Sequence, residues 1–383
     1  MRVERVDSLK GVRDLAPDWE RLWGEDPSAS LFSSFEWVET WLEHFACIAP
    51  SAEGNGGPRA PRRPDPDDRP RPHLLVAREG EQLVAIVPLV RSERRWGPLP
   101  ARTLSLPVNG HSPASGFVAP RRVHEVASAV FEHLESAEGW DLLHLGGVPR
   151  AAPFTTALGE RARRSGWQVG DSVLAGSSIV RVTGTWEGYL GARSHNFRKS
   201  LGRAERSVGR IGPTTIEQHE GADAVRAAMA SFVEVDRESW KAESGESIGL
   251  RQDLASFYAT VAARCAERGR ATVWILRAGE EPAAATLCVR DREWLYILKS
   301  SFKSKFGSAY LSPTFILVGE ILRDAWRRAI PGIDFLHHSA FTERWANGRR
   351  EYERIVLSRR RPYPMLLRLL SRRRAIASLP SLA

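Results

Sequence analysis

The feature that most constrains the fold of this chain is a change of hydrophobic period after three apolar runs. The runs "TVWILRA", "AAATLCV" and "EWLYILKSS" are joined by the turn sequences "GEEP" and "DRE", a pattern typical of three antiparallel strands. The third run leads through the basic loop "FKSKFGSAYL" into "SPTFILVGEILRDAWRRA", where Phe315, Val318 and Leu322 recur at helical spacing. We therefore predict a strand, a basic glycine-containing loop and a helix in direct succession.

The start of this helix has the chemistry of an anion site. Ser312 is a good N-cap, and Pro313 suits the first helical position. A helix N-terminus presents backbone N–H groups without partners and a partial positive charge. With Lys303 and Lys305 in the preceding loop, this segment is predicted to bind a pyrophosphate group.

The rest of the second half alternates helices and strands. A unit opens near Ser178 with the strand "SIVRV", helices follow at about 222–240 and 250–269, and "IDFLHH" and "YERIVLS" are predicted to be strands. The segment 193–210 is strongly basic, and its residues Phe197, Leu201, Ala204 and Val208 form one apolar face of a helix.

The first half is also α/β. "SSFEWVETWLEHF" predicts a helix capped by Ser33 or Ser34, and 141–147 is predicted to be a buried strand after a helix at 122–137. "HLLVARE" and "QLVAIVPLV" are two further strands. Residues 50–72 are rich in proline and lack large apolar side chains, which predicts a disordered insertion.

Composition limits the function classes. A chain of 383 residues with 42% hydrophobic residues is expected to form two domains, and the net charge of +9 favours phosphate-bearing partners. The three cysteines fit no zinc or disulfide spacing, so we predict no metal site and a reducing compartment. Without a long apolar run, a cytoplasmic location is expected.

Several segments resemble the GNAT acyltransferase superfamily, specifically its BioF2-like/CelD-like acetyltransferase branch and the related FemAB-type transferases. They are "SSFEWVETWL", "FRKSLGRAER", "ESWKAESG", "LYILKSSFKSKFGSAYLSP", "GIDFLHH" and "FTERW". The resemblance implies an α/β fold of mainly antiparallel sheets with flanking helices, in tandem GNAT-like domains. We assign 1–177 to a degenerate first domain, 178–358 to the acyltransferase domain and 359–383 to a basic tail.

The resemblance also implies a site. The donor would be acetyl-CoA or another acyl-CoA, bound by a backbone N–H at Leu298 in the parted strands and by the residues of the loop and helix start, namely Lys303, Lys305, Gly307, Ser308, Ala309 and Ser312. The loop departs from the family pattern, since Ser304 stands where arginine or glutamine is usual. Tyr310 would protonate the departing CoA thiolate, and the alternative is that its side chain only packs against its neighbours.

Other residues are candidates for the acceptor side. Asp334 could orient or deprotonate an amine, and the alternative is that it is a helix cap or an ion-pair partner. Trp240 and Lys241 in "ESWKAESG" suggest acceptor recognition. Alternatively, Trp240 packs and Lys241 caps the helix carbonyls.

Arg198, Lys199 and Arg203 could bind a phosphate of the acceptor, or form a solvated face. Arg344 in "FTERW" replaces a family lysine in charge but not as a base. Adjacent strand residues His337 and His338 would point to opposite faces.

The predicted function is acyl-CoA-dependent N-acylation of an amine, with an envelope polysaccharide or peptidoglycan precursor as a candidate acceptor. One alternative is FemAB-like transfer from aminoacyl-tRNA, and another is a non-catalytic accessory protein of polysaccharide biosynthesis. Duplex nucleic acid is not expected, because aromatic residues do not interleave with the basic ones. The basic tail, with Met365 to Leu370 among arginines, could contact the inner membrane face or dock on the protein itself.

Overall fold

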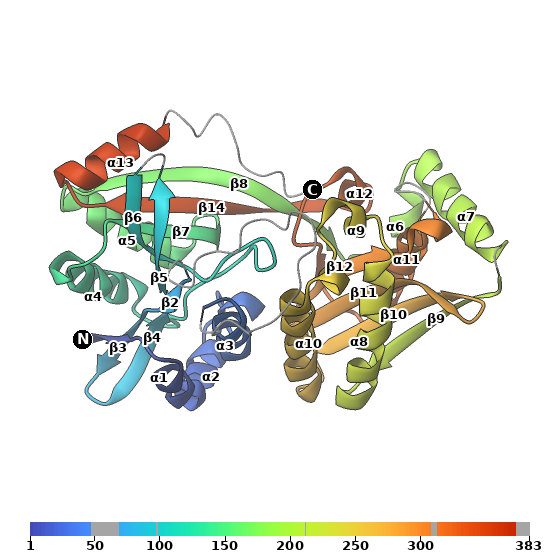
Figure 1. Ribbon diagram of the computed structural model, residues 1–383, viewed down its shortest axis with the longest axis horizontal. Helices are drawn as coiled ribbons and strands as arrows, with labels where there is room; N and C mark the ends of the chain where they lie inside the picture. The colour runs from blue at the N-terminus through green and yellow to red at the C-terminus, as the bar shows by residue number, and fades with distance from the viewer. Residues whose placement is uncertain (47–68, 97–98, 211, 308–311, 373–383) are drawn as a thin grey trace, which may run out of the picture. The chain divides into compact units, whose positions relative to one another are not determined.

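The chain folds into two compact units (Figure 1). The computed structural model describes residues 1–46, 69–96, 99–210, 212–307 and 312–372. One unit consists of Met1–Ala175 and Glu351–Ala383, and the other of Gly176–Arg350. The second unit ends before the predicted boundary at residue 358, because residues 352–357 pair with a strand of the first unit.

The first unit contains two sheets. A small antiparallel sheet consists of β1 (Arg2–Val6), β3 (Leu74–Glu79) and β4 (Gln82–Val87). The second sheet has the order β2 (Arg71–Pro72), β5 (Val90–Trp96), β6 (Leu99–Ser105), β7 (Leu142–Pro149) and β14 (Gly348–Ser358). β6 and β7 are parallel, whereas their neighbours pair antiparallel. The predicted strands of the first half are confirmed.

The helices of the first unit are α1 (Leu9–Asp14), α2 (Ala16–Glu25), α3 (Phe35–Trp41), α4 (Val123–Ser136), α5 (Pro153–Arg164) and α13 (Pro362–Arg372). Ser34 caps α3 as predicted, because its hydroxyl accepts a hydrogen bond from the Trp37 N–H. Residues 50–68 of the predicted insertion lie outside the described residues, and Arg71 and Pro72 form β2 rather than disordered chain.

Part of the C-terminal tail docks on the first unit. Leu367 of α13 is fully buried in a cluster with Ala101 and Leu142, and the Tyr363 hydroxyl donates to the Pro100 carbonyl. Met365 and Leu366 remain exposed, and residues 373–383 lie outside the described part. Docking on the protein itself is therefore observed for α13, while membrane contact stays a prediction. None of the described helices is long and apolar enough to cross a membrane.

The second unit is built on one mixed sheet. Its strands follow the order β8 (Gln168–Arg181), β13 (Gly332–Asp334), β12 (Trp294–Phe302), β11 (Glu281–Asp291), β10 (Ala271–Ala278) and β9 (Thr214–Glu220). β12 and β13 run parallel, and the other pairs are antiparallel. The predicted three-stranded meander and the mixed, mainly antiparallel α/β class are confirmed. Each unit thus has one parallel strand pair in an otherwise antiparallel sheet.

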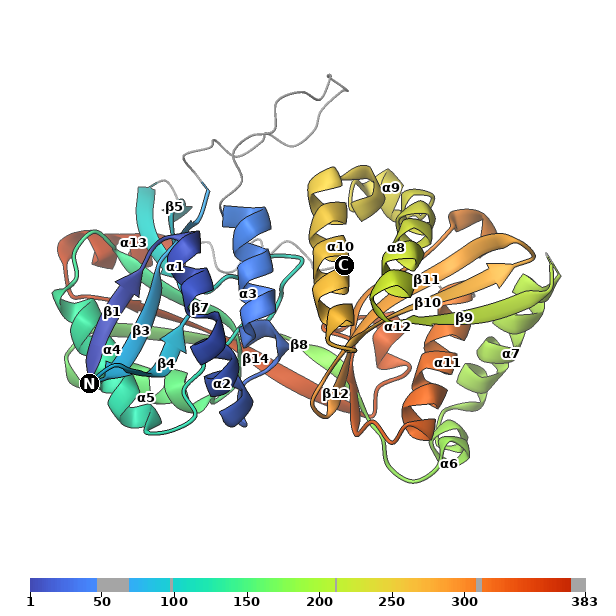
Figure 2. The same cartoon turned by 90° about the horizontal axis from the view of Figure 1, so that it is seen from below.

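Helices cover both faces of this sheet (Figure 2). α8 (Ala222–Arg237) and α10 (Gln252–Glu267) pack on one face, and α7 (His195–Gly209) and α11 (Pro313–Arg327) lie on the other. The short helices are α6 (Trp186–Gly191), α9 (Lys241–Ser244) and α12 (Ala340–Glu343). The predicted basic helix is confirmed as α7, since Phe197, Ala204 and Val208 are buried on its inner face.

Candidate functional site

The sheet of the second unit opens between two parallel strands. β12 and β13 pair over only three positions, from Trp294 opposite Gly332 to Tyr296 opposite Asp334. β13 then ends, whereas β12 continues to Phe302. We call this opening the fork. It corresponds to the parted strands predicted from the sequence.

A β-bulge lies on β12 at the fork. The pairing of β12 with β11 shifts from Ile297 opposite Cys288 to Lys299 opposite Leu287, so Leu298 has no partner in the register. A bulge residue keeps its backbone groups out of the regular ladder. The structure therefore places Leu298, predicted to polarise the donor carbonyl, at the fork.

Close packing holds the paired part of the fork together. A Cβ atom on Gly332 would lie 2.5 Å from the ring of Trp294, so only glycine allows this approach. The Arg350 guanidinium lies over the same ring, 4.0 Å from its centroid, and forms a 2.8 Å ion pair with Asp334. β13 is thus fixed against β12 up to the point where the strands part.

Asp334 occupies the last position of β13 and is fully buried. One carboxylate oxygen accepts a 2.8 Å hydrogen bond from the Leu336 N–H, and Leu336 has a φ of 60°, unusual for a branched side chain. Burial raises the pKa of Asp334, and Arg350 opposes this effect. This placement favours the ion-pair alternative, in which Asp334 holds the turn after β13.

A cluster of charged and hydroxyl side chains lies on the α8 and α10 side of β12. We call it the Asp236–Lys241 cluster, and it consists of Asp236, Lys241, Ser247, Tyr258, Lys299 and Ser301. The buried Asp236 carboxylate accepts hydrogen bonds from Ser247 Oγ (2.9 Å), the Gly249 N–H (3.1 Å) and Ser301 Oγ. Lys241 Nζ donates to the Ser300 carbonyl (2.5 Å) and to Ser301 Oγ (2.9 Å). Lys241 is thereby anchored to the part of β12 that extends beyond β13 and pairs with β11.

Burial shifts the pKa values of this cluster. Burial and the neighbouring charge of Lys299 lower the pKa of Lys241 to about 8, although Asp236 acts in the opposite direction. Burial also lowers the pKa of Lys299. Burial would raise the pKa of Asp236, but Lys241 and the hydrogen bonds hold it below its usual value. An amine with a pKa near neutrality can take up and release protons under ordinary conditions.

The sequence pattern identified Lys241 but not its partners. Lys299 and Ser301 alternate along β12, a period that puts both on one face of the sheet. Asp236 follows Phe232 by one helical turn of α8 and so belongs to its buried face. Polar residues on the inner face of β12 and on the buried face of α8 were the sequence signal that could have identified these partners. Trp240, beside Lys241, is 43% exposed, so it is not packed in the core.

The structure gives Lys303 a different role from the predicted one. Lys303 is 2% exposed, and its Nζ forms ion pairs with Glu234 (2.6 Å), Glu281 (2.8 Å) and Glu238 (3.1 Å). Lys305 also pairs with Glu281, at 2.7 Å. Binding a pyrophosphate through these ammonium groups is disfavoured, because carboxylates already neutralise them.

The start of α11 agrees with the prediction in its backbone. Pro313 is the first helical residue and Ser312 takes the N-cap position, but the Ser312 side chain makes no capping hydrogen bond. Gly307 has an extended backbone with φ of 170°, so its conformation does not itself require glycine. Ser308, Ala309 and Tyr310 lie outside the described residues.

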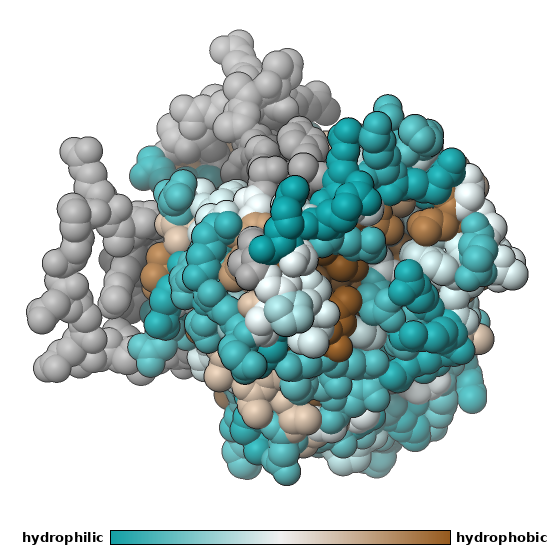
Figure 3. Space-filling view, turned by 90° about the vertical axis from the view of Figure 1, so that its right-hand side faces the viewer, coloured by the Kyte–Doolittle hydropathy of each residue, from teal (hydrophilic) through white to brown (hydrophobic). Residues whose placement is uncertain are grey.

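The predicted basic residues of α7 differ in their contacts. The Arg198 guanidinium donates to the carbonyls of Gly191 (2.8 Å) and Arg193 (2.6 Å), so it closes the turn between α6 and α7. Lys199 and Arg203 are exposed. Figure 3 views the end of the molecule that carries α6 and α7 and shows a mainly hydrophilic surface.

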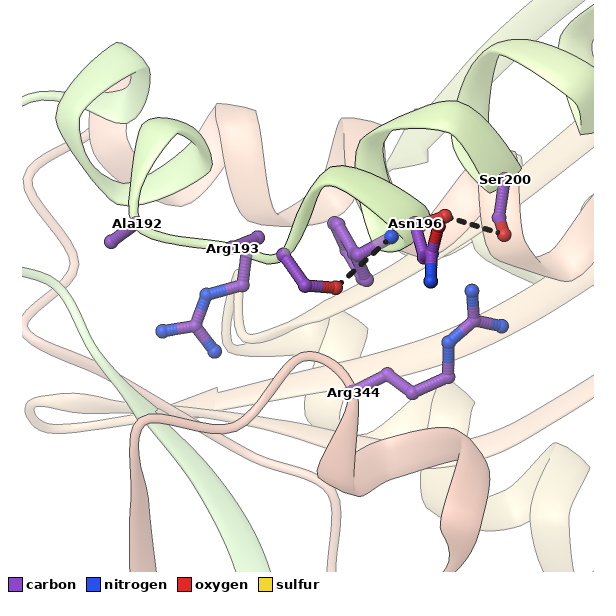
Figure 4. A pocket seen from close by; sticks show the side chains of 7 residues that line it. Ala192, Arg193, Asn196, Ser200 and Arg344 are labelled. Carbon is purple, nitrogen blue, oxygen red and sulfur yellow. Dashed lines mark hydrogen bonds between the residues drawn. The ribbon is translucent and has the colours of Figure 1, made fainter.

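A pocket of about 350 Å³ lies at the start of α7 (Figure 4). Its lining residues are Ala192, Arg193, Ser194, Asn196, Phe197, Ser200 and Arg344. Of the predicted substrate-binding residues, Arg344 belongs to this pocket, and its guanidinium lies over the ring of Phe315, 4.5 Å from the centroid. Arg193 was not identified from the sequence.

The histidine pair does not lie on a strand, so the predicted alternation does not apply. β13 ends at Asp334, and His337 and His338 follow in the turn. His337 Nδ1 lies 2.8 Å from the Phe335 carbonyl oxygen, and His338 Nδ1 lies 3.0 Å from Ser178 Oγ. Within the described residues, no group of three or more potential ligands could hold a metal ion.

Most of the second unit is similar to a known protein family. Residues 195–353 match the model of the acetyltransferase (GNAT) domain. No curated protein sequence matches the chain. FemX has a similar structure, with 12% identity and a TM-score of 0.55, covering 91% of this chain and 96% of FemX.

Two further solved structures share the fold. The C-terminal domain of a lysylphosphatidylglycerol synthetase from Agrobacterium fabrum has 12% identity and a TM-score of 0.53, covering 95% of this chain and 97% of that one. L-PGS from Bacillus licheniformis has 12% identity and a TM-score of 0.51, with coverages of 94% and 96%. At these identities the similarity shows the fold alone.

Proposed function

Since residues 195–353 carry a GNAT acetyltransferase domain, in a chain related to the GNAT and FemAB-like proteins, we propose that this protein is an N-acyltransferase. It takes an acyl group from acyl-CoA and transfers it to an amine. The observation that carries the proposal is the fork, because a bulged Leu298 stands directly where β12 and β13 part. Leu298 has no partner in the register with β11, and β13 ends before it, so its backbone N–H is the group that we propose for the acyl carbonyl oxygen.

The residues around the fork have separate roles in the proposed acyl transfer. The Leu298 N–H donates to the acyl carbonyl oxygen and stabilises the negative charge that develops on it when the amine attacks. The thioester supplies the activated acyl group. Neutral Lys241 accepts the proton that the attacking amine loses, directly or through one water. Asp334, which is buried under Arg350, positions the turn after β13 and does not itself exchange protons with the acceptor.

The start of α11 holds the donor's pyrophosphate in this proposal. Pro313 has no N–H and the Phe315 N–H donates to the Ser312 carbonyl, which leaves the Thr314 N–H as the first-turn donor at a helix end that carries partial positive charge. The backbone, rather than Lys303 or Lys305, supplies this site. Tyr310 remains the proposed proton donor for the departing thiolate.

The proposed acceptor is an amine on an anionic molecule, such as an envelope polysaccharide or peptidoglycan precursor. The net charge of +9 and the exposed basic side chains Lys199 and Arg203 of α7 support this class. Trp240, exposed beside Lys241, offers an apolar contact for the acceptor.

Aminoacyl transfer from tRNA is a second candidate. The observation that favours it is the fold similarity to FemX and to a lysylphosphatidylglycerol synthetase, the latter named for an aminoacylated lipid. The two candidates differ in their donor, so a donor-binding measurement separates them.

Isothermal titration of the full chain with acetyl-CoA, longer acyl-CoAs and free CoA tests the proposal. We expect saturable binding of at least one acyl-CoA and weaker binding of adenosine alone. If folded protein binds none of these compounds, the acyl-CoA donor is wrong. Labelled product formed from aminoacyl-tRNA in their absence would then establish the second candidate.

A further inference from the structure

The pocket at the start of α7 combines cationic and polar groups. Arg193 and Arg344 both line it, Asn196 lies between them in Figure 4, and Ser194 and Ser200 are further hydrophilic lining residues. None of its lining residues is acidic. A volume of about 350 Å³ is within the range of pockets that hold small organic ligands rather than a lone ion.

Neutral contacts hold the guanidinium group of Arg193 in place. Arg193 donates to the carbonyl of Ala346 at 2.7 Å, and its guanidinium carbon lies 4.8 Å from the ring centroid of Tyr189. Among the described residues, no carboxylate forms an ion pair with Arg193. Arg344 lies over the rings of Phe315 and Phe197. Carbonyl contacts such as those of Arg193 orient an arginine without cancelling its charge.

The helix adds to the positive potential of the pocket. α7 is 15 residues long, and it begins at His195 directly between the pocket residues Ser194 and Asn196. Ser194 Oγ accepts the Phe197 N–H, which leaves the N–H groups of the first two helical residues without a partner inside the helix. In Figure 4 the side chain of Asn196 points toward Arg344, so an amide donor also faces the cavity.

We propose that this pocket binds a phosphate group of a substrate, with Arg344, Arg193 and Asn196 as its principal donors. Planar guanidinium groups match phosphate oxygens, and two of them in one cavity favour a doubly charged group over a single carboxylate. The proposal deepens the proposed function and rests on it for the identity of the substrate. Phe315, under Arg344, belongs to the first turn of α11, so the pocket adjoins the proposed donor site.

The phosphate can come from either substrate. A phosphate of the CoA nucleotide and a phosphate of a nucleotide-linked acceptor present the same chemistry to Arg344. Inorganic pyrophosphate therefore serves as the first probe, followed by CoA, CoA lacking its 3′-phosphate, and uridine diphosphate as a model of a nucleotide-linked acceptor.

The test compares three variants of the full chain by isothermal titration with these probes. Arg344→Gln removes a charge at the pocket, and Asn196→Asp places a carboxylate in it. Arg206→Gln is the matched control, since Arg206 is also exposed on α7 but does not line the pocket. We expect Arg344→Gln and Asn196→Asp to weaken pyrophosphate binding by about tenfold to a hundredfold, and Arg206→Gln by less than about twofold.

Asn196→Asp also protects the test against a folding failure. Arg344→Gln removes a contact with Phe315 and could destabilise the unit, whereas an acidic side chain in the first turn of a helix stabilises it. Equal pyrophosphate affinity in wild type and Asn196→Asp, or no pyrophosphate binding by wild type, would overturn the proposal.

The nucleotide probes identify the source of the phosphate. Stronger binding of CoA than of its 3′-dephospho form, lost in Asn196→Asp, assigns the pocket to the donor. Uridine diphosphate binding that Asn196→Asp abolishes assigns it to the acceptor. If CoA binds to all variants equally and pyrophosphate does not bind, the pocket proposal fails while the acyl-CoA function stands. If pyrophosphate binds as expected and no CoA does, the pocket proposal stands and the acyl-CoA function fails.

Discussion

The ammonium nitrogen of Lys241 lies 3.8 Å from a carboxylate oxygen of Asp236, and the hydroxyl of Ser301 forms hydrogen bonds with both residues. The Asp236 side chain is fully buried and that of Lys241 is only 14% exposed. Removing such a pair from water is costly, and its mutual attraction often only offsets that cost. This pair contacts β12 beyond its pairing with β13, and our proposal gives it a role at the fork.

The pH dependence of stability tests the state of Lys241. Its pKa is about 8 in the folded protein, below the ordinary lysine value of 10.5, so the unfolded chain binds more protons between these two values. The unfolding free energy contributed by Lys241 should then rise with pH across this window, by about 3 kcal/mol. Urea unfolding of wild type and Lys241→Met at both ends of the window measures it.

The control for this prediction is Lys199→Met, which removes an exposed lysine of α7. Lys299, whose pKa burial also lowers, acts in the same direction in wild type and Lys199→Met, and its interaction with Lys241 is part of the difference that Lys241→Met measures. If wild type and Lys241→Met change equally with pH, Lys241 has an ordinary pKa and cannot serve as the proposed base.

Leu298→Pro tests the backbone N–H at the bulge. Proline removes this one donor and is tolerated at bulges, where the ladder does not need the N–H. We expect kcat to fall by about 10²-fold or more, with donor affinity unchanged within about twofold. Leu298→Ala keeps the N–H and should retain activity. Similar rates for the two variants would show that the Leu298 N–H does not stabilise the reacting carbonyl.

Lys303 and Lys305 form a matched pair for a stability test. Lys303→Met leaves Glu234, Glu238 and Glu281 close together without their common partner, which should lower the unfolding free energy by about 2 kcal/mol. Lys305 is 57% exposed, so Lys305→Met should cost less than about 1 kcal/mol. Chemical denaturation measures both, and CoA affinity should be nearly the same in both folded variants. A large, selective loss of CoA affinity in Lys303→Met would restore its predicted role.

A double-mutant cycle separates the structural and catalytic roles of Asp334. Because burial raises the pKa of Asp334, its ionisation costs stability as pH rises, and Arg350 reduces that cost. We expect Asp334→Asn and Arg350→Met to couple by about 1–3 kcal/mol in unfolding free energy. Activity of Asp334→Asn, measured where the variant is fully folded, should stay near that of wild type. A loss above about 10²-fold in that folded variant would make Asp334 the base after all.

Local patterns were sufficient for the elements that frame the site. The meander β10 to β12, the start of α11 at Pro313 and the inner face of α7 all follow from hydrophobic period, turns and caps within short stretches of chain. The same patterns failed after Asp334, where an apolar run predicted a longer strand. There the chain turns at Leu336, held by the Asp334 side chain, and no local period encodes that bond.

The sequence by itself determined the order of strands and helices, the basic helix and the family resemblance, because each depends on residues close together in the chain. Only the tertiary structure decided what the charged side chains do. Lys303 meets Glu234 across 69 positions, and Ser301 meets Asp236 across 65. Packing of α8 against β12 brings these groups together and removes them from water. Burial and the nearest opposite charge then determine what each lysine does. Lys303 forms structural ion pairs, and Lys241, whose pKa burial lowers, is the candidate base.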